Sequence, residues 1–262
     1  MGFALIASAA EPARLSGAAS YDGQPSVAVL QGKPWVAWVR YRDNEGDRVV
    51  VRAGEGGGEG EIGTEVLTPQ PGQYVRPVLA ACQGELWCLW TRSEPDQVSS
   101  IWYSRREAVK GRWSAPEVLV RGEVRAHQNV EVAASQTGDL AAVYQVHTGK
   151  DYDIHLVRWE GHGWGEPQPL SGPETSDWDP VATFDAKGVL HVAWSGFRDG
   201  DYDIYWDRPL EPCDKSLRRR ISARGEYDLH PWLAAAPAGK ICATWDVVRV
   251  AGHALSGSTT IT

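Results

Sequence analysis

Residues 179–194, DPVATFDAKGVLHVAW, contain two short apolar runs separated by a turn around Gly188, and the second run ends in Trp194. Small and β-branched residues on both sides of a glycine-containing turn are typical of a β-hairpin. Four other stretches share this form: QPSVAVLQGKPWVAW at 24–38, RPVLAACQGELWCLW at 76–90, QNVEVAASQTGDLAAVY at 128–144 and HPWLAAAPAGKICATW at 230–245. The sequence therefore predicts five related hairpins.

The hairpins recur at a nearly constant period. Their anchor residues lie 52, 52, 51 and 51 positions apart, at Pro25, Pro77, Asn129, Pro180 and Pro231. A third run follows each of the first four hairpins (RVVVR, SIWYS, DIHLV, DIYWD), and an outer run is visible as APEVLV and EPQPLS. Four strands in each repeat of about 50 residues are typical of a β-propeller, in which stacked sheets bury each other's apolar faces.

The two ends of the chain fit one repeat together. EPARLS at 11–16 resembles EPQPLS at 166–171, and the fifth repeat has no outer strand of its own. We therefore predict a single-domain, all-β, five-bladed β-propeller of four-stranded antiparallel blades, the last closed by the N-terminal strand. The predicted blades span 21–68, 73–120, 125–171, 176–222, and 227–262 together with 1–16. A fragment of a six- or seven-bladed ring is the alternative.

Composition restricts the classes of partner. The net charge is −8, which disfavours nucleic acid because phosphate binding needs a basic face. No apolar run approaches the roughly 20 residues of a membrane helix. The N-terminal apolar stretch has no preceding positive residue, so we expect no signal peptide. The compartment stays open between the cytoplasm and a domain of a larger exported protein. Cys82 and Cys88 are expected as buried thiols, with a disulfide as the alternative.

The working surface is expected at one end of the blades. Because strand direction alternates, the loop entering strand one and the loop after strand two share a face, which surrounds the channel mouth in a propeller. Polar residues precede every anchor, and arginines follow strand two. Arginine grips carboxylates, and aromatic rings stack on flat ligands. The predicted ligand-binding residues are Gln24, Arg76, Gln128, Asp179 and His230, with Arg40, Arg92, Arg198, Arg249, Asp177, Trp178 and Asp228. The alternative is that these are ordinary solvated loop ends.

Other patterns point to structure rather than chemistry. DGDYD at 199–203 has calcium-like spacing but lacks the rest of an EF-hand loop, so we interpret it as a hairpin turn. The aromatic residue that ends the second run of each hairpin is interpreted as core between blades. We call these residues the strand-two aromatics, and they are Trp38, Trp90, Tyr144, Trp194 and Trp245. The seven histidines show no metal-ligand spacing, and no GxSxG motif or phosphate loop occurs. We expect no metal and no cofactor.

The unit PVA-D--G--HVAW---RDGDYDIY--R----W--P--LS resembles repeats of bacterial propellers of the sialidase-like group. The resemblance covers nearly the whole chain and implies the fold, whereas the Asp-boxes of sialidases are absent and no tyrosine–glutamate pair can be assigned. WDPVATF also looks similar to the Asp-Pro that opens strand one in arabinanase-type furanosidases, which would make Asp179 a base. Tachylectin-type five-bladed lectins are a third comparison, but these repeats are more diverged than theirs.

The predicted function is recognition of a carbohydrate, another small polar ligand or a protein partner at the channel mouth. A glycoside hydrolase of sialidase or furanosidase type is the alternative, and it needs a second carboxylate at a defined separation. Whether the protein is an enzyme is left open, and neither nucleic acid nor a membrane is expected as a partner.

Overall fold

The computed structural model describes residues 14–16, 20–43, 45–54, 63–94, 98–122, 126–172, 175–209, 218–222, 225–236 and 239–248, and the backbone of 254–261. Regular structure in these residues consists of β-strands arranged in antiparallel sheets. None of the described segments forms a helix with the length and apolarity that crossing a membrane would require.

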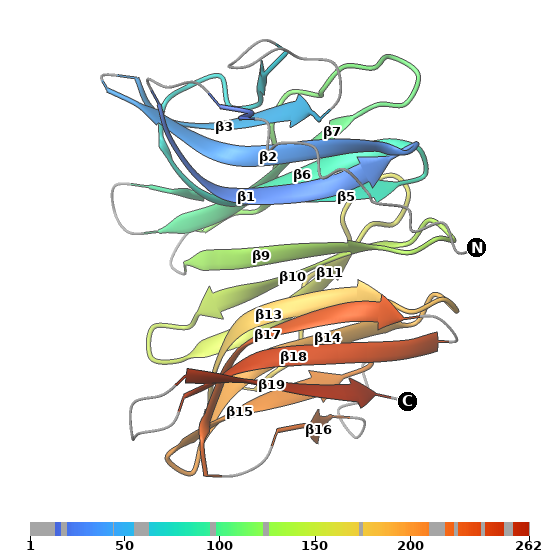
Figure 1. The fold of residues 1–262 in the computed structure, drawn as a ribbon. Helices are drawn as coiled ribbons and strands as arrows, with labels where there is room; N and C mark the ends of the chain where they lie inside the picture. The colour runs from blue at the N-terminus through green and yellow to red at the C-terminus, as the bar shows by residue number, and fades with distance from the viewer. Residues whose placement is uncertain are drawn as a thin grey trace, which may run out of the picture.

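The strands form five sheets in chain order, four with four strands and a last one with three among the described residues. We call them sheets one to five (Figure 1). Sheet one contains β1 (Tyr21–Leu30), β2 (Lys33–Arg42), β3 (Gly46–Ala53) and β4 (Glu65–Val66); sheet two contains β5 (Gln73–Cys82), β6 (Glu85–Ser93), β7 (Ser99–Arg106) and β8 (Glu117–Val120); sheet three contains β9 (His127–Ala134), β10 (Leu140–His147), β11 (Tyr152–Arg158) and β12 (Gln168–Pro169); sheet four contains β13 (Ser176–Phe184), β14 (Leu190–Arg198), β15 (Asp201–Asp207) and β16 (Arg219–Arg220); and sheet five contains β17 (Tyr227–Ala236), β18 (Lys240–Val248) and β19 (Ala254–Ile261).

The first strands of successive sheets lie next to one another, β1 beside β5, β5 beside β9, β9 beside β13 and β13 beside β17. The sheets are therefore stacked face to face in chain order, and the apolar core lies between them. Each main apolar cluster combines residues of two neighbouring sheets. Burial of both faces of the middle sheets supplies the main driving force for folding.

Four of the five strand-two aromatics belong to this core, as the sequence indicated, whereas Trp38 is buried outside the four clusters. Trp90, Tyr144 and Trp194 are at most 1% exposed, and Trp38 and Trp245 are 5% and 8% exposed. Trp90 and Trp194 each share a cluster with the leucine that directly follows the outer strand of the preceding sheet, Leu67 and Leu170 respectively.

The repeated DYDI phrase has the predicted structure in sheet four. Asp199 and Gly200 form a two-residue hairpin turn, because Arg198 pairs with Asp201, and both turn residues have positive φ, 56° and 83°. This geometry matches a type I′ turn, which favours aspartate followed by glycine. Ile154 and Ile204 are fully buried at equivalent positions of sheets three and four.

The described residues do not include a strand that closes the ring. Residues 1–13 of the predicted closing strand lie outside the described residues, and β19 ends sheet five in the described part of the chain. Leu15 contacts sheet one, where its carbonyl accepts a hydrogen bond from Arg52 (2.9 Å). Val27 of β1 and Trp232 of β17 are 64% and 62% exposed. The structure therefore supports stacked antiparallel sheets of propeller type without displaying a closed ring.

Three of the four cysteines lie in the described residues, and none of these three forms a disulfide. Cys82, Cys88 and Cys242 are free, so Cys82 and Cys88 form no disulfide. Cys213 lies outside the described residues.

Candidate functional site at the strand-one bulges

Every first strand contains a β-bulge at its polar end. In each sheet two residues of strand one oppose a single residue of strand two. That single residue is the strand-two aromatic of the sheet, which is Trp38, Trp90, Tyr144, Trp194 or Trp245. The first bulge residue has a positive φ of 50° to 56° in all five sheets, although none is glycine. These five residues are Gln24, Arg76, Asn129, Asp179 and His230. Bulges and left-handed non-glycine residues both concentrate at functional sites, where they re-aim side chains.

The sequence placed Gln128 in this set, and the structure corrects that assignment by one residue. Gln128 pairs with Gln145 in the regular ladder, and Asn129 takes the bulge. In the other four sheets the second bulge residue is a proline, whereas sheet three has Val130 there. The sequence alignment on proline therefore shifted by one position in sheet three, where no proline marks the bulge.

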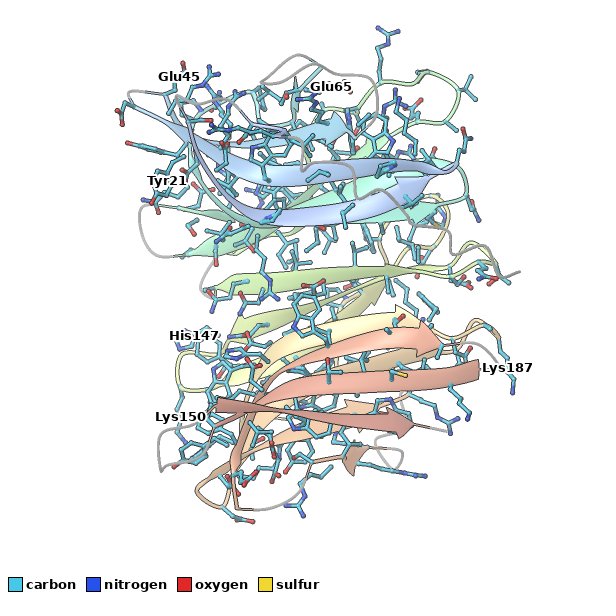
Figure 2. The ribbon with its side chains drawn as sticks, viewed as in Figure 1. Tyr21, Glu45, Glu65, His147, Lys150 and Lys187 are labelled. Carbon is cyan, nitrogen blue, oxygen red and sulfur yellow. The ribbon has the colours of Figure 1, made fainter. Side chains whose placement is uncertain are left out.

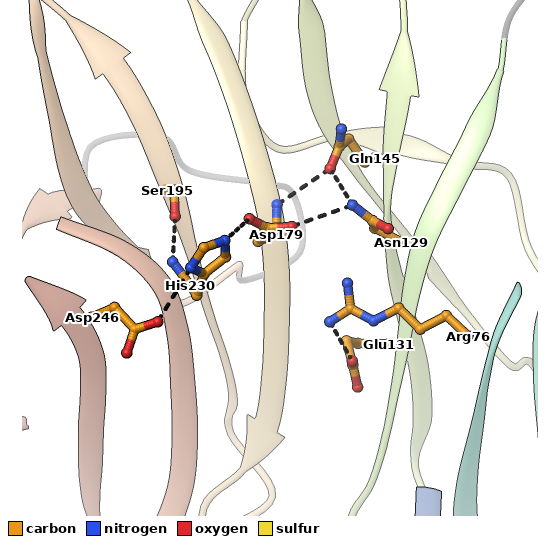
Figure 3. Close-up of polar contacts among 8 residues, drawn as sticks. All are labelled: Arg76, Asn129, Glu131, Gln145, Asp179, Ser195, His230 and Asp246. Carbon is orange, nitrogen blue, oxygen red and sulfur yellow. Dashed lines mark hydrogen bonds and ion pairs between the residues drawn. The ribbon is translucent and has the colours of Figure 1, made fainter. Parts of the chain in front are cut away.

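Asp179 is held by residues of the neighbouring sheet (Figure 3). Its Oδ1 accepts a hydrogen bond from Nδ2 of Asn129 (3.2 Å), and its backbone N–H donates to Oε1 of Gln145 (3.3 Å). Gln145 also accepts from Asn129 (3.0 Å) and is 2% exposed. The side chain of Asp179 is 23% exposed, so it remains accessible while its position is fixed.

His230 connects Asp179 to a second carboxylate. Its Nε2 lies 3.6 Å from Oδ2 of Asp179 and its Nδ1 lies 3.3 Å from Oδ2 of Asp246. The backbone N–H of His230 donates to the buried hydroxyl of Ser195 (3.1 Å). The imidazole is 59% exposed, so a ligand can reach the group that bridges the two carboxylates.

A second charged pair lies beside this chain of contacts. Nη2 of Arg76 is 3.2 Å from Oε1 of Glu131, and the backbone N–H of Arg76 donates to Oε1 of Gln24. Burial raises the pKa of the Glu131 carboxyl, and the neighbouring Arg76 opposes that rise. Gln24, Arg76, Glu131 and Trp232 line one cavity of about 600 Å3, which brings residues of sheets one, two, three and five to a common space. We call the five bulge residues with Glu131 and Asp246 the axial site.

Two predicted ligand-binding aspartates have a structural role instead. Asp177 and Asp228 are 0% and 3% exposed, and each accepts the indole N–H of the strand-two tryptophan, Trp194 at 3.0 Å and Trp245 at 2.9 Å. Asp22 holds Trp38 in the same way (2.8 Å). Burial raises the pKa of the Asp177 and Asp228 carboxyls.

The predicted arginines do not form one group. Arg198 pairs with Asp177 (2.9 Å) and lies 3.8 Å over the ring of Tyr205, and Arg40 is 8% exposed within sheet one. Arg92 pairs with Glu94 (3.2 Å) in a separate cleft. Arg249 lies outside the described residues.

Trp178 lies directly before Asp179 and contacts the rings of Tyr152 (6.2 Å) and Tyr202 (5.5 Å), the two tyrosines of the repeated DYDI phrase. The row continues from Tyr202 to Tyr227 at 5.5 Å. Tyr152 also contacts the ring of His147 (4.7 Å), which Figure 2 labels at the end of the strands opposite Lys187. These rings form an aromatic border beside the axial site.

Five residues of the axial site and its support were absent from the predicted ligand-binding set: Asn129, Glu131, Gln145, Ser195 and Asp246. Gln145, Ser195 and Asp246 each follow the strand-two aromatic, so polar character at that repeat position was a usable signal. In the described ranges, no three histidine, cysteine, aspartate or glutamate side chains gather closely enough to hold a metal ion.

Comparison with known proteins gives the fold. No protein-family model matches the chain, and no curated protein matches it in sequence. Among solved structures, it is similar to the α-L-arabinanase of Penicillium chrysogenum complexed with arabinobiose (TM-score 0.59, 13% identity, covering 91% of this chain and 76% of that one). It is also similar to the endo-arabinase of Bacteroides thetaiotaomicron (TM-score 0.53, 13% identity, covering 96% and 98%). A protein of unknown function from Dyadobacter fermentans matches with TM-score 0.53 and 11% identity, covering 95% and 96%.

Proposed function

We propose that the protein recognises a carbohydrate at the axial site, with Asp179, His230 and Asn129 as its central polar contacts. The fold supports this proposal, because the similar arabinanase structures are β-propellers and the described sheets have the same all-β organisation. The five bulge residues carry this proposal. Each is polar and each has a left-handed backbone conformation that costs a non-glycine residue about 1–3 kcal/mol. Gln24 and Arg76 line one cavity with Glu131, while Asn129, Asp179 and His230 form one connected chain of contacts, which supports a role for the side chains themselves.

The chemistry of the site suits a neutral polyhydroxylated ligand. Asp179 and Asp246 supply acceptors, and the guanidinium of Arg76 supplies donors, as does an N–H of the His230 imidazole. Trp232 and Trp178 offer ring faces at the cavity and at its border. Because the similar solved structures include arabinanases, arabino-oligosaccharides are the first ligands to test.

One observation favours glycoside hydrolysis as the second candidate. Glu131 has a raised pKa because it is buried, and a general acid needs a carboxyl that stays protonated near neutral pH. In that reaction Glu131 would protonate the leaving oxygen and Asp179 would act as base. Recognition is preferred because Glu131 is paired with Arg76, which favours its ionised form.

Binding of arabinobiose and longer arabino-oligosaccharides by isothermal titration calorimetry, beside a glycan array, tests the proposal. Asp179→Ala should lower affinity at least tenfold, while the exposed turn variant Asp43→Ala should leave it unchanged. Absence of binding to every glycan, or full affinity in Asp179→Ala, would overturn the proposal. Release of reducing ends from arabinan that Glu131→Gln abolishes would establish the hydrolase instead.

We further propose that the five sheets close as one five-bladed domain, with residues 11–16 as the outer strand of sheet five. Leu15 and Trp38 line one pocket, as Leu67 packs with Trp90 and Leu170 with Trp194. The hydroxyls of Thr68, Ser171 and Ser222 follow such aliphatic residues and accept the backbone N–H of Val49, Ile154 and Ile204. Ser16 occupies the same repeat position, and its counterpart donor is the backbone N–H of Ser256.

A further inference from the structure

A second cleft lies away from the axial site, between sheets one and two. It has a volume of about 330 Å3, which is within the range of small-ligand pockets. The residues that follow β4, Thr68 to Gln70, form one wall, and Tyr74, Arg92 and Trp102 of sheet two form the other. Arg92, predicted for the channel mouth, therefore lines this cleft instead. We call it the Arg92 cleft.

The wall opposite Arg92 is fixed before any ligand binds. The hydroxyl of Thr68 accepts the backbone N–H of Val49 (3.0 Å), and its carbonyl accepts Nη1 of Arg48 (3.1 Å). The hydroxyl of Tyr74 donates to the carbonyl of Gln70 (3.0 Å). These bonds hold the backbone of the wall in place, and Arg92 is the charged residue that lines the cleft.

Sheet four has an arginine over the aromatic ring at the corresponding position. Trp102 and Tyr205 are equivalent, because each pairs with the strand-two aromatic of its sheet. In sheet four the buried Asp177 holds Arg198 over Tyr205 at 3.8 Å, and Gly196 makes room for it, since a Cβ there would lie 1.9 Å from Nη1 of Arg198.

Sheet two has different residues at the positions of Asp177 and Gly196. Tyr74 stands where sheet four has Asp177, and Arg92 stands where it has Gly196, as the strand pairings show. The guanidinium of Arg92 lies 5.5 Å over the Trp102 ring, and its ion pair with the partly exposed Glu94 uses Nε. The counterpart of the buried carboxylate is therefore missing opposite Arg92, and the Nη atoms offer a fork that a planar carboxylate matches.

We propose that the Arg92 cleft binds a small ring compound that carries a carboxylate. The carboxylate would pair with the Nη atoms of Arg92, in the role that Asp177 has for Arg198. The ring would lie against Trp102 and the proline-containing wall. A sugar acid and an aromatic acid share this chemistry, and the choice between them is left to the experiment.

Ligand-observed NMR and calorimetry on the full chain test the proposal with glucuronic acid and phenylacetate, and with glucose and phenylethanol as the matched uncharged compounds. At least one acid should bind, and its uncharged match should bind at least tenfold more weakly. Arg92→Met should reduce binding of the acid at least tenfold, whereas Arg112→Met, which removes an exposed arginine of sheet two, should not.

Glu94→Gln gives a readout that a purely structural role of Arg92 would not change. Removing the competing carboxylate should tighten acid binding several-fold, because Arg92 loses its described ion-pair partner. Arabinobiose should not compete with the acid bound at Arg92, which separates this cleft from the axial site. Failure of both acids to bind at millimolar concentration, or equal binding by wild type and Arg92→Met, would overturn the proposal.

Discussion

The buried hydroxyl of Ser195 in sheet four accepts a hydrogen bond from the backbone N–H of His230 in sheet five, at 3.1 Å. Gln145 accepts the backbone N–H of Asp179 in the same way between sheets three and four. Between sheets one and two, where residue 39 is a valine, the side chain of Gln24 accepts the N–H of Arg76 instead. At these three junctions a side chain of one sheet thus fixes the bulge of the next.

Ser195→Ala should destabilise the fold and displace His230. The variant leaves the partly buried N–H of His230 without its acceptor, which costs about 1–2 kcal/mol of unfolding free energy. Urea denaturation measures this loss, and Val109→Ala, at a side chain that is 98% exposed, serves as the control with little expected change. An unchanged urea midpoint in Ser195→Ala would show that this link between sheets contributes nothing.

Asp228→Asn should alter the pH dependence of stability. Burial raises the native pKa of the Asp228 carboxyl above its unfolded value of about 3.9, so the native state binds more protons between the two values. The contribution of Asp228 is greatest below the unfolded pKa and is lost as the pH rises through the native pKa. The stability of Asp228→Asn relative to wild type should therefore increase from pH 4 to pH 7.

Urea denaturation at several pH values in that range checks this sign. The asparagine side-chain oxygen can still accept the indole N–H of Trp245, so the comparison isolates the charge. A stability difference that stays constant with pH would contradict the raised pKa.

Arg76→Met should raise the pKa of Glu131 further. Burial already raises it, and the guanidinium 3.2 Å away is the group that opposes the rise. Carboxyl-carbon NMR titration of glutamate-labelled protein measures the change, with Arg112→Met as the control for a loss of positive charge. If the protein proves to be a hydrolase, its alkaline limb should move to higher pH in Arg76→Met.

Residues 1–16 should stabilise sheet five whether they are attached before residue 17 or after Thr262. Deleting them should lower the free energy of unfolding, because Leu15 would no longer cover Trp38. Attaching these residues after Thr262 through a flexible linker should restore the free energy of unfolding, since the same strand could then pair with β19. Equal stability of the deletion variant and the wild type would rule out closure by this segment. Ser16→Ala gives a milder version of the same test.

The hairpins could be predicted from sequence because each is encoded locally, by two apolar runs around a turn with glycine. The bulges were harder to recognise. A bulge shifts the register by one residue, and in sheet three Val130 replaces the proline that marks the other four. Gln128 was accordingly predicted where Asn129 stands.

The composition of the site depended on contacts that sequence patterns do not reveal. Gln145 and Asp179 are 34 positions apart and meet because neighbouring sheets stack. Asp177 resembles a solvated loop residue in sequence but is fully buried against Trp194. Its counterpart in sheet two is Tyr74, and this exchange could be seen in the sequence only after the sheets had been aligned by their bulges.

Asp179, His230 and Arg76 have a left-handed backbone conformation. Glycine variants at these positions can therefore distinguish the loss of a ligand contact from the loss of the fold. Glycine adopts this conformation without the steric penalty that the present side chains meet. Replacing one of them by glycine would remove a ligand contact and relieve local strain together. Lost affinity would then accompany a higher melting temperature, a combination that misfolding cannot produce.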